Sequence, residues 1–173
     1  PAPPLRPRRN PLLGRPAGGP LATIAAYTKN DAKLPPGCEL PGGEADVAAV
    51  ISVYPAVDLK EAYANPTRFD LLDNRLTLQN FLGGSPEKLP ELYQLATPTH
   101  HVDATLETHK RLPPTLILHG VDDQLVPLFH SQRLYEHLVA ASQTVTFISI
   151  PRTEHGFEFR AGGIGEQLER AAV

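Results

Sequence analysis

The sequence predicts an α/β fold, with a mostly parallel sheet and flanking helices. Val47–Tyr54 is a continuous apolar run that Pro55 ends, which is typical of a strand covered on both faces. Two further apolar runs, Thr115–Gly120 and Thr144–Ile150, predict two more strands. Segments with helical spacing or turn residues separate these runs. Because strands alternate with helices, we expect the three strands to lie side by side in this order and to be parallel.

The composition places limits on the class of protein. With 173 residues the chain is long enough for one domain. A net charge of -3 gives no general attraction to nucleic acid or to an anionic membrane, and no apolar stretch approaches the length of a membrane span. Cys38 is the single cysteine, so an internal disulfide is excluded and a cytoplasmic location is favoured. The composition does not indicate an oligomeric state.

The first residues differ from the rest in composition. Pro1–Pro20 contains seven prolines and four arginines, a composition that disfavours both a helix and a central strand. We therefore divide the chain into a disordered Pro/Arg-rich lead, residues 1–11, and one domain, residues 12–173. The sequence contains no methionine, even at position 1, so we expect a partial sequence.

The remaining elements follow in order along the chain. Leu21–Lys29 predicts a short buried helix, and the Pro/Gly-rich segment Asn30–Gly43 predicts a loop. Ala56–Leu82 is mixed and has two interpretations, part of a cap over a site or ordinary loop and helix packing. Ser85, Pro86 and Glu87 predict the start of a helix that continues toward Ala96 and that Pro90 shortens or bends. Phe129–Ala141 predicts an amphipathic helix, and Gly165–Val173 predicts the beginning of another.

Two short motifs place an acid and a histidine just past two strand ends. HGVDDQLVP at His119–Pro127 holds Asp123, and TEHGF at Thr153–Phe157 holds His155, which lies 32 residues further on. A carboxylate that orients an imidazole is one half of a Ser-His-Asp triad. We expect an Asp123 oxygen within hydrogen-bond distance of a His155 ring nitrogen; Asp122 is the alternative acid. The non-catalytic alternatives are that the aspartate caps a loop and that the histidine is a solvent-exposed loop residue.

These segments resemble bacterial α/β-hydrolases of the esterase/lipase type. The resemblance rests on AVISVYPAVDL (Ala49–Leu59), FLGGSPEKLPELYQLATP (Phe81–Pro98), PPTLILHGVDDQLVPLFHS (Pro113–Ser131) and TEHGF. It implies the C-terminal half of an α/β-hydrolase fold, hydrolysis of a small carboxylic ester, and no cofactor. It also implies that Asp123 and His155 are the acid and base of the triad, and that His119 is a packing residue at a strand end.

The triad order in this family, Ser then Asp then His, puts the nucleophile upstream in a G-x-S-x-G turn. The segment that fits is GRPAGG at Gly14–Gly19, where Pro16 stands in place of the serine. Proline has no hydroxyl, and its fixed φ near -65° opposes the strained turn. By the resemblance, the backbone N–H of Ala17 would form part of the oxyanion hole. We therefore expect this chain to be inactive alone; a plain Gly/Pro loop is the alternative interpretation of the segment.

Other groups suggest weaker alternatives. The spacing of His100, His101, His109, His130 and His137 matches no common metal-ligand pattern, so we predict no metal site. Cys38 lies in a Pro/Gly loop, and we expect an ordinary thiol there. Two functions remain beside ester hydrolysis: a prolyl-oligopeptidase-like peptidase, and a non-catalytic relative that uses its cleft for binding.

Overall fold

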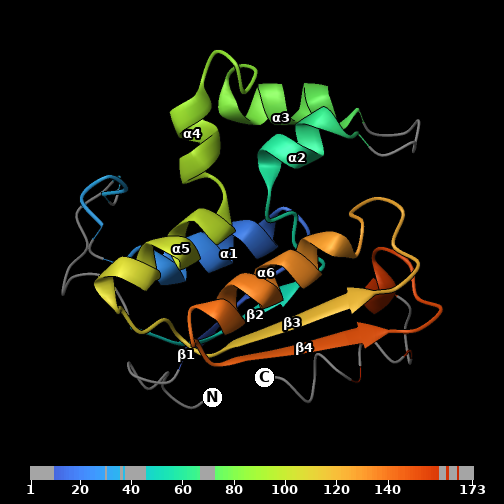
Figure 1. Ribbon diagram of the computed structural model, residues 1–173. Helices are drawn as coiled ribbons and strands as arrows, with labels where there is room; N and C mark the ends of the chain where they lie inside the picture. Colours follow the sequence, from blue (N-terminus) through green and yellow to red (C-terminus); the bar gives the residue numbers. More distant parts are fainter. Residues whose placement is uncertain are drawn as a thin grey trace, which may run out of the picture.

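A four-stranded parallel sheet forms the centre of the computed structural model, which describes residues 10–29, 31–35, 37, 46–66, 73–159, 163 and 167. The strands lie in the order β1-β2-β3-β4, so spatial order follows chain order (Figure 1). Every neighbouring pair is parallel. The prediction of three adjacent parallel strands is therefore confirmed. The strands are β1 (Asn10–Gly14), β2 (Val47–Val53), β3 (Thr115–Gly120) and β4 (Val145–Ile150).

Three helices pack on one face of this sheet, namely α1 (Gly18–Tyr27), α5 (Pro98–Thr108) and α6 (Phe129–Ala140) (Figure 1). Val50 and Ile117 point from β2 and β3 into the core beneath them. Their strand neighbours Ile51 and Leu118 belong to a second buried cluster on the opposite face. Because both faces of the central strands are buried, these strands need apolar residues at consecutive positions.

A second helical layer lies outside the first (Figure 1). It consists of α2 (Leu59–Ala64), α3 (Asn74–Leu82) and α4 (Pro90–Leu95). The side chains of Asp58 and Asp73 accept backbone N–H groups at the starts of α2 and α3, which is the usual capping role of aspartate. The described part of Ala56–Leu82 therefore contributes two helices to this outer layer.

Several predicted boundaries need correction. The helix expected from Ser85 begins at Pro90, because the proline occupies the first helical turn and Leu89 before it is not helical. Strand β1 includes Asn10 and Pro11, which we had placed in the lead; Pro11 is tolerated because β1 pairs with β2 alone among the described strands. Helix α1 begins at Gly18, three residues before the predicted start.

Some predictions fall outside the described residues. These are the lead over residues 1–9, the thiol of Cys38 and, with the exception of Gln167, the whole helix expected over Gly165–Val173. Within the part of the chain that the structure describes, no helix is both long and apolar enough to cross a membrane.

Candidate active site

The predicted site residues all follow the carboxyl ends of strands, at one edge of the sheet. Pro16 follows β1, Asp123 follows β3 and His155 follows β4. All four strands are parallel, so their carboxyl ends lie at the same edge. Ligands of open α/β sheets bind at this edge, which makes it the natural place for a site.

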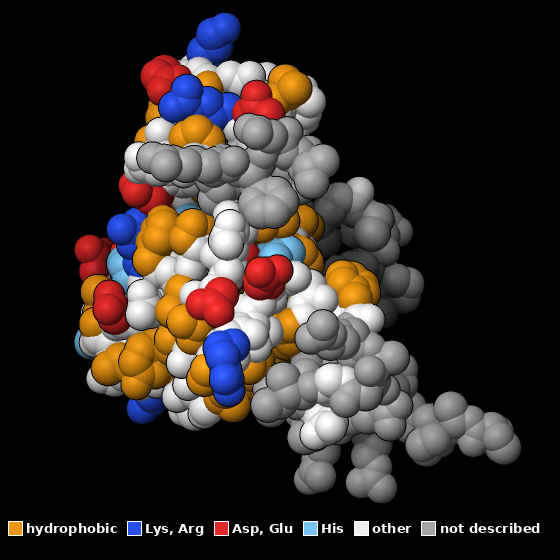
Figure 2. Space-filling model, turned by 90° about the vertical axis from the view of Figure 1, so that its right-hand side faces the viewer, with side chains coloured by type: hydrophobic (Ala, Val, Ile, Leu, Met, Phe, Trp, Pro, Cys, Tyr) orange, Lys and Arg blue, Asp and Glu red, His pale blue; other side chains and the backbone are white. Residues whose placement is uncertain are grey.

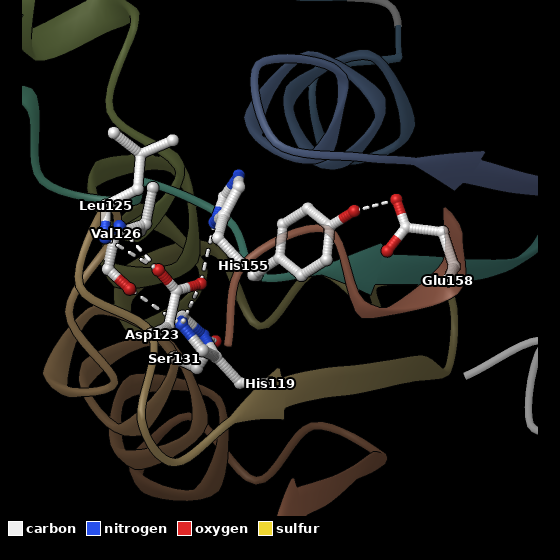
Figure 3. Close-up of polar contacts among 8 residues, drawn as sticks. His119, Asp123, Leu125, Val126, Ser131, His155 and Glu158 are labelled. Atoms are coloured by element: carbon white, nitrogen blue, oxygen red, sulfur yellow. Dashed lines mark hydrogen bonds and ion pairs between the residues drawn. The ribbon is translucent and has the colours of Figure 1, made fainter. Parts of the chain in front are cut away.

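Asp123 and His155 form the hydrogen bond that the sequence predicts. The ring Nδ1 of His155 lies 2.7 Å from Oδ2 of Asp123 (Figure 3). The carboxylate accepts, so Nδ1 carries the proton. The other ring nitrogen, Nε2, is buried and has no hydrogen-bond partner among the described residues. Nε2 is thus available to accept a proton from a hydroxyl group.

Both oxygens of the Asp123 carboxylate accept hydrogen bonds. Its Oδ1 accepts the backbone N–H groups of Leu125 at 2.9 Å and Val126 at 2.8 Å (Figure 3). Burial raises the pKa of the Asp123 carboxyl, but hydrogen bonds from His119, His155 and Val126 outweigh burial and hold this pKa well below its usual range. Asp123 is therefore ionised. Asp122, the alternative acid, is exposed, and it is Asp123 that faces His155.

Two residues near His155, Tyr54 and Glu158, were not predicted from the sequence as part of the site. The Tyr54 ring lies 4.3 Å from the His155 ring, centroid to centroid, and the Tyr54 hydroxyl donates to the Glu158 carboxylate. Glu158 is buried and also lies 3.7 Å from an Arg15 nitrogen. Arg15 is next to Pro16, so this chain of contacts connects the loop after β1 to the loop that carries His155. The available signal was the Tyr54-Pro55 pair at the end of β2, where Tyr54 has a φ of 39°.

The turn between β1 and α1 brings the backbones of the two elements very close together. A Cβ on Gly14 would lie 2.0 Å from the carbonyl oxygen of Gly18, so only glycine fits there. The Gly19 N–H donates to the Pro16 carbonyl at 3.2 Å, and Ala17 adopts right-handed helical angles. Pro16 is not among the described residues with positive φ. The turn therefore brings β1 and α1 into close approach, and the side chain at position 16 carries no hydroxyl.

An apolar cavity of about 530 Å³ lies beside this turn, between α1, α6 and the second helical layer. Pro16 and Ala17 form part of its wall, and among the described residues that line it none is Lys, Arg, Asp or Glu. Figure 2 shows hydrophobic side chains exposed below the outer helices. His130 also lines the cavity, and burial lowers its pKa to about 4, so its ring is neutral near pH 7. The cavity suits an uncharged, apolar group.

No group of three or more His, Cys, Asp or Glu side chains that could hold a metal ion occurs within the described ranges. His137 of the predicted histidine set bonds to Asp103, and His101 contacts the Leu95 carbonyl oxygen.

The family model called BD-FAE matches residues 5–138, more than half of the chain. The chain belongs to this family of α/β-hydrolase esterases. The resemblance inferred from the motifs is therefore confirmed at the level of fold and family.

Individual relatives agree with this membership. The chain is 29% identical over 155 residues to esterase LipC of Mycobacterium tuberculosis, covering 87% of this chain and 35% of LipC. It is 31% identical over 153 residues to the probable carboxylic ester hydrolase LipM of the same organism, covering 85% of this chain and 32% of LipM. The chain thus spans about a third of the length of these curated relatives.

Among solved structures, the fold resembles that of an esterase from Thermogutta terrifontis, with a TM-score of 0.65 and 24% identity. The match covers 94% of this chain and 52% of that one. At this identity the likeness supports the fold alone.

Proposed function

We propose that the site is the acid–base half of a Ser-His-Asp esterase, and that this chain, with Pro16 at the nucleophile position, does not hydrolyse esters itself. The observation that carries the proposal is the hydrogen bond from His155 Nδ1 to Asp123, while His155 Nε2 has no hydrogen-bond partner among the described residues. Esters are the substrate class named for the relatives LipC and LipM.

The proposed mechanism assigns each atom a task. With a serine at position 16, His155 Nε2 takes the hydroxyl proton while the oxygen attacks the ester carbonyl. Asp123 holds the ring through Nδ1 and stabilises the imidazolium that forms. The Ala17 N–H contributes to binding the oxyanion. The imidazolium then protonates the leaving alcohol, and water releases the acid from the acyl-enzyme by the same steps in reverse.

The cavity supports a choice of substrate within this class. Its walls carry no charge among the described residues, and Pro16 and Ala17 lie in them. We propose that the apolar part of an uncharged ester lies there, with its carbonyl at position 16. A peptidase activity remains the alternative, and the same proteins assayed on a peptide p-nitroanilide distinguish the two.

The test measures hydrolysis of p-nitrophenyl butyrate. The parent chain, which has Pro16, should show no more hydrolysis than its His155→Ala variant, because loss of the nucleophile lowers turnover by a factor on the order of 10⁶. Pro16→Ser in a fusion of this chain with the part of LipC that lies outside the matched region should recover hydrolysis. Asp123→Ala and His155→Ala should each abolish the recovered activity.

Two results would contradict the proposal. The first is hydrolysis by the printed chain that His155→Ala abolishes, which would mean that another residue is the nucleophile. The second is a folded Pro16→Ser fusion that hydrolyses the ester equally well with Ala at position 155.

A further inference from the structure

We propose that His119 and Ser131 are positioning residues, which lock the Asp123 loop so that the carboxylate faces His155. The inference rests on the proposed function, since it gives Asp123 and His155 their roles. It changes the interpretation of His119, which the sequence indicated only as a packing residue at a strand end.

His119 is fully buried in β3 and contacts three groups. Its Nδ1 lies 2.6 Å from the Ser131 hydroxyl, and its Nε2 lies 2.8 Å from the Val126 carbonyl oxygen. The same Nε2 is 3.3 Å from Oδ2 of Asp123 (Figure 3). The carbonyl and the carboxylate only accept hydrogen bonds, so Nε2 carries the proton. Nδ1 of the neutral ring then accepts from the Ser131 hydroxyl, and one tautomer satisfies all three contacts.

These contacts join β3, which precedes the loop that carries Asp123, to α6, which follows it. His119 precedes the loop on β3, and Ser131 follows it on α6. Val126 makes two hydrogen bonds: its carbonyl oxygen accepts one from His119 Nε2, and its N–H donates one to Asp123 Oδ1. Oδ2 of Asp123 consequently faces two imidazoles, His155 at 2.7 Å and His119 at 3.3 Å. A carboxylate with both oxygens occupied in this way has little freedom to turn away from His155.

Ser131, His119 and Asp123 have the residue types of a triad of their own, but burial excludes that role. Ser131 and His119 each have 0% exposure, so no substrate carbonyl can reach the Ser131 oxygen. The network therefore acts on the chemistry only through Asp123, as an outer layer of hydrogen bonds that orients a reacting pair.

The experiment measures exchange of the His155 Nδ1 proton with water by nitrogen-15 NMR on the full chain. His119→Leu removes both ring nitrogens, and Ser131→Ala removes only the hydroxyl. We expect exchange to become roughly tenfold faster in each, corresponding to one hydrogen bond. His119→Gln, whose amide both donates and accepts, should restore slow exchange. His137→Leu, at a partly exposed position of α6 that pairs with Asp103 of α5, is the matched control and should leave the exchange rate of the His155 Nδ1 proton unchanged.

Circular dichroism and thermal melting establish that each variant is folded; if His119→Leu does not fold, Ser131→Ala carries the test alone. Unchanged exchange in a folded Ser131→Ala variant would overturn the inference. This readout needs no turnover, so failure of the Pro16→Ser fusion to hydrolyse esters would not affect it. In an active fusion, His119→Leu should lower kcat roughly tenfold with KM unchanged, and His119→Gln should recover it. A fusion active at full kcat with His119→Leu would likewise overturn the inference.

Discussion

Replacement of the buried His130 by phenylalanine should remove a defined part of the chain's pH-dependent stability. Burial lowers the pKa of His130 from 6.5 to about 4; Asp58 opposes this shift and Arg133 adds to it. The unfolded chain takes up a proton near pH 6.5, whereas the folded chain takes it up only near pH 4. Stability is therefore fully present above pH 6.5 and declines as the pH falls toward 4. The difference between the pKa values of the unfolded and folded chain corresponds to about 3 kcal/mol.

Urea unfolding at a series of pH values between 4 and 7 measures this contribution. The free energy of unfolding of the parent should fall more steeply with decreasing pH than that of His130→Phe, with a cumulative difference of about 3 kcal/mol at equal m-values. His137→Phe, a histidine replacement at a partly exposed position of the same helix, is the control. Parallel curves for the parent and His130→Phe over this range would refute the reasoning.

Four other substitutions have expected outcomes. Asp123→Ala leaves two backbone N–H groups and the His155 ring without their acceptor, which should cost about 3–5 kcal/mol and lower Tm by roughly 6–20 °C in a melting scan. In the parent, the pKa of Asp123 is lowered, so the ionised carboxylate stabilises the fold above the usual carboxyl pKa, and this stabilisation is lost as the pH falls through the lowered pKa. In Asp123→Asn the free energy of unfolding should therefore fall less steeply with decreasing pH in the acid range. Gly14→Ala should lower the free energy of unfolding by at least about 2 kcal/mol, because the added Cβ would clash with the Gly18 carbonyl. Gly18→Ala, where a Cβ meets open space, should be neutral or should stabilise α1 by up to about 1 kcal/mol. Equal urea midpoints for the two variants would contradict this.

The sequence predicted the parts of the fold that local pattern determines. The apolar runs at Val47–Tyr54 and Thr115–Gly120 located β2 and β3 within a residue, because a strand buried on both faces needs an unbroken apolar run. The amphipathic spacing of Phe129–Ala141 located α6 equally well. The hydrogen bond between Asp123 and His155 was also predictable, since parallel strands end at one sheet edge.

Other features depended on contacts that local pattern does not encode. Helix α5 was missed, although Thr97 and Pro98 form a helix-start signal. Glu158 lies 104 residues from Tyr54 in the chain, and their hydrogen bond arises only once β2 and the His155 loop are folded together. His119 likewise looked like a packing residue, because its bond to Ser131 depends on how α6 lies against β3.

The roles proposed for Asp123, His155 and position 16 are tested most directly by locating a covalent adduct. The measurement is the mass of the peptide containing residue 16 after treatment of the Pro16→Ser fusion with a fluorophosphonate, which reacts with an activated serine hydroxyl. The proposal predicts an adduct on position 16 that is strongly reduced by His155→Ala and by Asp123→Ala and absent with Pro16. An adduct on another residue, or equal labelling of position 16 without His155, would contradict it.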